Sequence, residues 1–171
     1  MRQPREAANL AELYDEEPMP WSRVADALGS GSIPPEVPCF LGTVRPDGRP
    51  HSAGVGVAQY DSDLYFTSGP GTRKARNLDV NPACTLSLRL AGVDVVFEGE
   101  AHRVTDRETL AGVAAVFRDG GWPAEVDSDA ITAPYSAQSA GPPPWHLYRF
   151  APHTAFGVGL RAPHGASRWS F

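Results

Sequence analysis

Residues 64–82 read LYFTSGPGTRKARNLDVNP, and the rest of the chain is organised around this stretch. Residues 64–68 alternate in the way that suits a half-buried strand, and the Gly-Pro-Gly that follows requires a turn. Thr72 is a favourable N-cap for a short helix, which the Asn-Pro pair at 81–82 must end. The stretch therefore predicts a strand that leads through a glycine turn into a helix.

The first turn of this predicted helix carries Arg73, Lys74 and Arg76. The positive end of a helix dipole disfavours cations there, by about 0.3–1 kcal/mol for each exposed charge. A bound anion would reverse the sign, because free backbone N–H groups, the dipole and the cations would all attract it. This pattern predicts a phosphate or carboxylate cradle. The alternative is a solvated basic helix face whose mismatch with the dipole is screened by salt.

Length and charge limit the partners that the chain can have. Its 171 residues fit one domain with a sizeable core. Fifteen basic and twenty acidic residues give a net charge of -5, so the molecule as a whole repels nucleic acid and anionic membranes. The basic cluster is local, and it indicates a small anionic ligand.

Cysteine use, histidine spacing and the N-terminus favour a soluble cytoplasmic protein without a metal. Cys39 and Cys84 lie in apolar surroundings, where a free cysteine behaves as a small buried hydrophobe. The five histidines have no metal-ligand spacing. The N-terminus lacks the apolar core of a signal peptide, and no apolar run is long enough for a membrane span.

The chain reads as two parts. Residues 5–16 place Ala, Leu and Tyr among acids, which predicts a short amphipathic helix, and residues 21–28 add another turn or two. A Gly, Ser and Pro linker follows. We therefore expect residues 1–36 to form an N-terminal helical arm packed on a main domain of residues 37–171.

The main domain reads as antiparallel strands separated by turn signals, with a helix capped by Asp106 and ended by Gly120. Gly99 marks a bend or bulge within one strand. The expected strands are 39–45, 50–60, 64–68, 85–90, 93–104, 145–150 and 155–160. Without regular βαβ alternation, they predict a mostly β (α+β) fold: a closed or nearly closed antiparallel barrel with short flanking helices.

Two further features have open interpretations. Residues 122–144 are rich in Pro, Ala, Ser and Gly, and a connection of this length is either disordered or covers something. The side chains of Trp145 and Trp169 either stack on a planar ring or anchor loops to the barrel.

Several motifs together resemble a known family. The hairpin LGTVRPDGRPH at 41–51, with LYFTS at 64–68 and KARNL at 74–78, resembles the pyridoxamine 5'-phosphate oxidase-like split β-barrel family of flavin-binding proteins. The likeness runs from about residue 37 to residue 160. The KARNL run, PWHLYR at 144–149 and RWSF at 168–171 look most like the actinobacterial branch of flavin and deazaflavin (coenzyme F420) dependent oxidoreductases.

The resemblance implies an antiparallel split β-barrel and a homodimer with the cofactor across the subunit interface. The cations would take the cofactor's phosphate. The cofactor-binding residues that it implies are His51, Ser52, Thr67, Ser68, Arg73, Lys74, Arg76, Asn77, Trp145, Arg168 and Trp169. The chain lacks the arginine-histidine pattern near the C-terminus that grips substrate in true pyridoxamine phosphate oxidases, so the resemblance does not extend to that reaction.

The expected activity is hydride transfer from reduced F420 to an unsaturated or quinone-like small molecule. FMN is the alternative cofactor, in an oxidase or reductase on the same fold. A non-catalytic flavin carrier or sensor is the alternative of another class. No side chain is assigned a catalytic role, because in such enzymes the cofactor does the redox chemistry while the protein binds and orients it.

Overall fold

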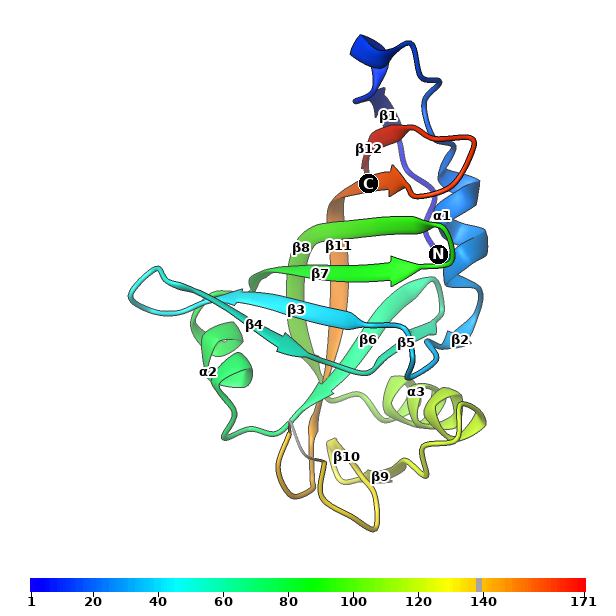
Figure 1. The fold of residues 1–171 in the computed structure, drawn as a ribbon. Coiled ribbons are helices and arrows are strands. Elements are labelled where there is room, and N and C mark those ends of the chain that lie inside the picture. The colour runs from blue at the N-terminus through cyan, green and yellow to red at the C-terminus, as the bar shows by residue number, and fades with distance from the viewer. Residues whose placement is uncertain (138–139) are drawn as a thin grey trace.

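A computed structural model describes residues 1–137 and 140–171 (Figure 1). Its strands are β1 (Glu6–Asn9), β2 (Gly31–Ser32), β3 (Cys39–Val44), β4 (Pro50–Gly54), β5 (Val57–Tyr60), β6 (Asp63–Ser68), β7 (Ala83–Leu90), β8 (Val93–Val104), β9 (Glu125–Asp127), β10 (Ala130–Thr132), β11 (His146–Gly159) and β12 (Ala166–Ser170). Its helices are the 3-10 turn η1 (Glu12–Tyr14), α1 (Trp21–Leu28), α2 (Arg73–Val80) and α3 (Arg107–Asp119).

One antiparallel sheet forms most of the molecule, in the order β2-β5-β6-β11-β8-β7-β3-β4, and β12 joins β1 to β11. The sheet curls, because inner-face side chains from β3, β5, β6, β7, β8 and β11 meet in a single apolar core. Leu41, Phe66, Leu86 and Phe97 are completely buried there. The predicted antiparallel split β-barrel with short flanking helices is confirmed.

The hairpin β3–β4 forms where the Pro-Asp-Gly turn predicts it. Gly48 has a φ of +81°, in the left-handed region that such a turn needs. The register pairs Thr43 with His51 and Val44 with Pro50, and the Arg45 N–H donates to the Arg49 carbonyl at 2.9 Å. The hairpin therefore holds Arg45 and His51 at neighbouring places near its tip.

The strand expected over residues 50–60 is two strands. β4 pairs with β3, whereas β5 pairs with β6 and β2. Val55 and Gly56 lie between them, and the chain changes partner there. An alternating pattern cannot distinguish one long strand from two that turn a corner, because the residue period is the same in both.

The two strands expected near the C-terminus are one. β11 runs for 14 residues and pairs with β8 along its length, with a register shift between Pro152 and Thr154. Gly99 of β8 lies opposite Pro152, and a Cβ on Gly99 would stand 2.1 Å from the Ala151 carbonyl oxygen. The extra residue is His153, so the bulge lies in β11, opposite Gly99, and not in the strand of Gly99 where the sequence analysis placed it; it lets β11 bend without ending.

The helix predicted over residues 5–16 is wrong. β1 pairs with β12 in the register Glu6 to Ser170, and only a 3-10 turn follows it. An isolated short helix is marginal in water, while the free edge of β12 satisfies the backbone groups of β1. The helix at residues 21–28 is confirmed, and its Trp21 and Val24 lie in the barrel core.

The first part of the segment 122–144 packs on α3. β9 and β10 form a hairpin, and Ala124 and Ile131 join an apolar cluster with Leu110 and Phe117 of the helix. The sequence left two alternatives for this connection, disorder or covering another part of the protein. The described residues show the second. Residues 124–131 cover α3, and Ala140 lies against Gly69 of the glycine turn. Residues 138 and 139 lie outside the described part of the chain.

Candidate functional site

The strand, glycine turn and helix of residues 64–82 form as the sequence predicts. Thr72 is the N-cap of α2, and its Oγ1 accepts a hydrogen bond from the Ala75 N–H at 3.3 Å. The same hydroxyl donates to the Gly69 carbonyl at 2.9 Å and lies 2.8 Å from Ser68 Oγ. These bonds fix the turn, so the N-terminus of α2 has a defined direction.

Three cations occupy the first turn of α2 in two different environments. Arg73 and Arg76 are exposed, whereas Lys74 is only 3% exposed. Burial lowers the pKa of the Lys74 ammonium below its ordinary value. The exposed arginines are available to a ligand from solution, whereas Lys74 is almost completely covered by the fold.

The tip of the β3–β4 hairpin brings two more basic groups to the same place. Burial, followed by the charges of Arg45, Arg73 and Lys74, lowers the pKa of His51. His51 Nδ1 and Arg45 Nε are shielded from solvent, and neither has a hydrogen-bond partner among residues 1–137 and 140–171. We call Arg45, His51, Arg73 and Lys74 the cationic cluster.

An anionic group fits the cationic cluster. A buried polar atom without a partner costs about 1–3 kcal/mol, and an oxyanion is an acceptor that could satisfy both orphaned nitrogens. Its charge would also offset the repulsion that lowers the pKa of His51. The free N–H groups of the first turn of α2 would add to the attraction. A phosphate group therefore matches the donors of this site in charge and in hydrogen bonding.

Arg45 is the residue of the cluster that the sequence analysis missed. The cation pattern at the start of the helix points only to the turn before α2 and the motif residues beside it. The signal lay in the hairpin, since a Pro-Asp-Gly turn places Arg45 opposite Arg49, one step beyond the pair of Val44 and Pro50. Register along a hairpin can be inferred from the turn, but the distance from its tip to α2 cannot.

Asn77 has a structural contact within the site. It is 2% exposed, and its Nδ2 donates to Thr43 Oγ1 at 2.9 Å. The Thr43 hydroxyl in turn donates to the His51 carbonyl at 3.4 Å. Asn77 thus fastens α2 to β3 and to the strand that carries His51.

The other polar residues of the motif point in several directions. Ser52 is exposed and lies opposite Gly42, on the other face of β4 from His51. Thr67 is opposite Leu147, which belongs to the apolar cluster at α3. Ser68 is completely buried and bonded within the turn.

The C-terminal residues do not join the cationic cluster within one chain. Trp169 is 1% exposed, with its ring centroid 5.2 Å from that of Trp21 in the core. Arg168 is exposed on β12, opposite Ala8. Figure 1 shows β12 in the upper part of the molecule and α2 at the left of its lower half, with barrel strands between them.

Trp145 is completely buried. Its indole N–H donates to the Gly141 carbonyl at 3.1 Å, and its ring lies against Trp122 at a centroid distance of 5.5 Å. Of the two interpretations that the sequence left open, these contacts support the anchoring role for both Trp145 and Trp169. Neither indole has a face open to solvent in the single chain.

A groove runs beside the N-terminus of α2. Its volume is about 460 Å³, and its walls are residues 69–72 and residues 140–144. Gly69 allows the close approach of the two walls, since a Cβ there would stand 2.0 Å from the Ala140 carbonyl oxygen. The groove extends the site along the glycine turn.

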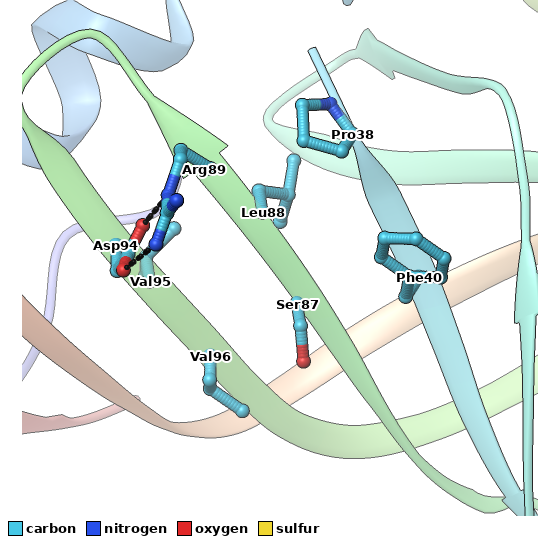
Figure 2. A pocket seen from close by; sticks show the side chains of 8 residues that line it. All are labelled: Pro38, Phe40, Ser87, Leu88, Arg89, Asp94, Val95 and Val96. Carbon is cyan, nitrogen blue, oxygen red and sulfur yellow. Dashed lines mark hydrogen bonds and ion pairs between the residues drawn. The ribbon is translucent and has the colours of Figure 1, made fainter.

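The outer face of the sheet carries two shallow hollows. Figure 2 shows the first, of about 360 Å³, where Phe40, Ser87 and Val96 line neighbouring strands. The Arg89–Asp94 ion pair, with Nε and Oδ1 2.7 Å apart, stands at one side of it. The second hollow, of about 430 Å³, continues along the same strands over residues such as Gly42, Thr85 and Glu98.

Among residues 1–137 and 140–171, no three His, Cys, Asp or Glu side chains gather as a metal ion would need. No helix in this same part of the chain is both long and apolar enough to cross a membrane.

Comparisons with known proteins agree with this architecture. Residues 32–159 match the family described as Pyridoxamine 5'-phosphate oxidase. A pyridoxine/pyridoxamine 5'-phosphate oxidase of Acidothermus cellulolyticus is 30% identical over an alignment of 151 positions, which covers 77% of this chain and 67% of that protein.

Solved structures show the same fold. A pyridoxamine 5'-phosphate oxidase-related, FMN-binding protein of Nostoc punctiforme superposes with a TM-score of 0.58 at 16% identity, covering 86% of this chain and 88% of that one. A protein described as an F420 reductase superposes with a TM-score of 0.52 at 20% identity, covering 76% of this chain and 93% of that one. The sequence match over residues 32–159, the split barrel and the cationic cluster agree with one another. The chain therefore belongs to the pyridoxamine 5'-phosphate oxidase-like family of flavin-binding oxidoreductases.

Proposed function

We propose that this protein binds F420 and transfers a hydride from its reduced form to an unsaturated or quinone-like small molecule. The observation that supports the proposal is the cationic cluster, with the orphaned His51 Nδ1 and Arg45 Nε beside the N-terminus of α2. The cofactor, when bound, supplies the hydride. The protein binds its phosphate, orients it and excludes water.

Each residue of the cluster has a distinct role in this proposal. Arg73 meets the phosphate from the solvent side, while Arg45 and His51 donate from the hairpin. Lys74 contributes its positive charge from a buried position. Asn77 maintains the spacing between α2 and β3, because its Nδ2 donates to Thr43 Oγ1 at 2.9 Å.

The number of cations supports F420 over FMN. FMN ends in one phosphate, whereas the F420 tail carries a phosphodiester followed by carboxylates. The cluster and the exposed Arg76 together offer more positive charge than one phosphate needs. The groove of about 460 Å³ beside the glycine turn provides space for a longer tail.

Titration of the protein with F420 and with FMN, followed by the visible spectrum of each cofactor, tests this assignment. We expect saturable binding of both cofactors, with F420 the tighter. Tighter binding of FMN would transfer the proposal to an FMN-dependent oxidase or reductase on the same fold, and binding of neither would overturn it.

Turnover separates an enzyme from a carrier. Reduced cofactor should be oxidised faster with protein than without it when a quinone or enone is supplied. If the cofactor binds tightly and no member of a broad acceptor panel is reduced above the protein-free rate, the protein is a flavin carrier or sensor.

We also propose that two chains form a homodimer through the outer face of β3, β7, β8 and β11. Phe40 and Val158 are 49% and 51% exposed on this face, and Val96 is 37% exposed between them. Small residues such as Gly42 and Ser87 lie on the same face of these strands, so a second sheet could approach closely. Figure 1 shows α1, α2 and α3 to the sides of these strands, leaving the face to a partner.

Sedimentation should therefore show twice the 18.3 kDa mass of one chain at micromolar concentration. Phe40→Glu should shift the protein to the monomer, because a charge at the centre of an apolar interface must be desolvated without a partner. Tyr135→Glu is the control, since Tyr135 is equally exposed, at 48%, outside these strands. A parent chain that sediments as a monomer would contradict the proposal.

A further inference from the structure

His51 lies on the face of the β3–β4 hairpin that α2 covers. The register places His51 opposite Thr43, and Arg45, two positions after Thr43, points to the same side of the hairpin. Asn77 of α2 donates from its Nδ2 to Thr43 Oγ1 at 2.9 Å, so the helix packs on this side. The imidazole therefore faces the side of the hairpin on which α2 lies.

The charges that act on His51 within the described residues, 1–137 and 140–171, are all positive. Burial lowers the pKa of the imidazole below its ordinary value of 6.5, and the charges of Arg45, Arg73 and Lys74 lower it further. The ring is therefore mostly neutral at pH 7 before an anion binds.

The other titratable groups beside the hairpin do not balance these charges. Asp47 at the hairpin tip accepts from the NH2 group of Arg49, with 2.6 Å between the nitrogen and Oδ2. Cys84 of β7 lies opposite Thr43, and burial raises the pKa of its thiol to about 12, so it is uncharged at neutral pH. Neither group supplies a free negative charge to the cationic cluster.

The two sides of the His51 ring differ in their surroundings. Nδ1 is buried and has no hydrogen-bond partner in the described part of the chain, whereas the residue as a whole is partly exposed. A neutral imidazole has one N–H, which water satisfies on the open side of the ring, while an N–H at Nδ1 would face three cations. With the proton on the open side, Nδ1 can donate to an oxyanion only when the ring gains a second proton and becomes the imidazolium.

A bound oxyanion reverses the electrostatics at Nδ1. Its negative charge favours the charged form of a neighbouring histidine, and its oxygen accepts the N–H that protonation creates. The orphaned Arg45 Nε offers a second donor to the same anion. Anion binding and protonation of His51 therefore favour each other.

We infer that the cationic cluster takes up a proton from the solvent when it binds an oxyanion, and that His51 Nδ1 receives this proton. The inference rests on the proposed function, because the oxyanion stands for the phosphate of the cofactor, and it adds a pH dependence to that site. Anion affinity is highest below the pKa that His51 has in the free protein. It falls as the pH rises toward the higher pKa of the bound state, and it is constant above that value.

The titration midpoint of His51, followed by the NMR signal of its imidazole C2–H, tests the inference. Sulfate is the probe, because it stays doubly charged across this range, whereas a phosphate group has its own pKa of about 6. At constant ionic strength, sulfate that saturates the amide shifts of residues 71–76 should raise the midpoint by about one pH unit or more. His51→Gln lacks the signal and so assigns it.

His164 gives the test its control. It is an exposed histidine in the loop between β11 and β12, which lies against α1, so its midpoint should not respond to sulfate. For a rise of about one unit at His51, sulfate should bind about tenfold more tightly below both pKa values than above both. His51→Gln should bind sulfate equally at the two pH values.

Three results would overturn the inference: an unchanged His51 midpoint in saturating sulfate, an equal rise at His51 and His164, or sulfate that moves no amide of residues 71–76. None of them decides the proposed function, which the cofactor titrations test separately. A protein that binds neither cofactor would overturn the proposed function whatever the midpoint of His51 does.

Discussion

Trp169→Ala should lower the free energy of unfolding by about 3–5 kcal/mol, the range for removing a buried aromatic side chain. Trp169 is 1% exposed and packs edge-on against Trp21, with ring centroids 5.2 Å apart. A Cβ on Gly157 would stand 2.8 Å from the Trp169 ring, so this ring also fills the space over β11. Chemical denaturation at a fixed protein concentration, without cofactor, measures the loss.

Leu13→Ala is the control for that measurement. Leu13 is 88% exposed on the N-terminal segment, so its truncation should change the unfolding free energy by no more than about 0.5 kcal/mol. Should Trp169→Ala unfold like the parent protein but bind cofactor poorly, the anchoring role would be wrong and the ring-stacking interpretation would return.

Arg73→Ala should weaken cofactor binding by about 1.5–3 kcal/mol, which is about 10- to 150-fold in the dissociation constant. Arg73 is exposed at the first turn of α2, and its charge helps to lower the pKa of His51, so it lies within electrostatic reach of the hairpin. Because the side chain is exposed, the stability of the cofactor-free protein should hardly change. A cofactor titration and a thermal melt measure the two effects.

Arg107→Ala is a matched control. Arg107 is also an exposed arginine directly after an N-cap, at the start of α3, so it shares with Arg73 its exposure and its place on a helix but lies outside the cationic cluster. Its loss should leave cofactor affinity unchanged. Equal affinity in Arg73→Ala and the parent would show that the cationic cluster does not bind the cofactor.

Arg73 is a cleaner test of the cluster than Lys74. Lys74 is 3% exposed and takes part in interactions within the fold, so its replacement would change stability as well as charge. The helix pattern of the sequence does not separate the two, because adjacent positions on a helix differ in burial according to what packs beside them.

Local signals predicted the helix N-caps and the turn of the β3–β4 hairpin. Thr72 caps α2 and Asp106 caps α3 because a hydroxyl or carboxylate at an N-cap satisfies a helix N–H directly. Gly48 turns the β3–β4 hairpin because a positive φ suits glycine. Where a bond or a dihedral angle is local, a few neighbouring residues are enough to predict it.

The elements near the two ends of the chain depend on strands that are distant in the sequence. Residues 6–9 form a strand because β12, more than 150 positions later, offers a free edge. β11 continues through its bulge because β8 pairs with it on both sides of Pro152. No local pattern contains such partners, so the sequence favoured a short helix and a strand break.

The sequence by itself determined the cationic turn, the β3–β4 hairpin and the family resemblance, because each depends on neighbouring residues or on a motif of fixed spacing. Only the tertiary structure decided that Arg45 and His51 meet Arg73 and Lys74, and that Trp145 and Trp169 are buried. The physical reason is that burial and through-space charge are set by sheet pairing between distant segments, which residue spacing does not encode.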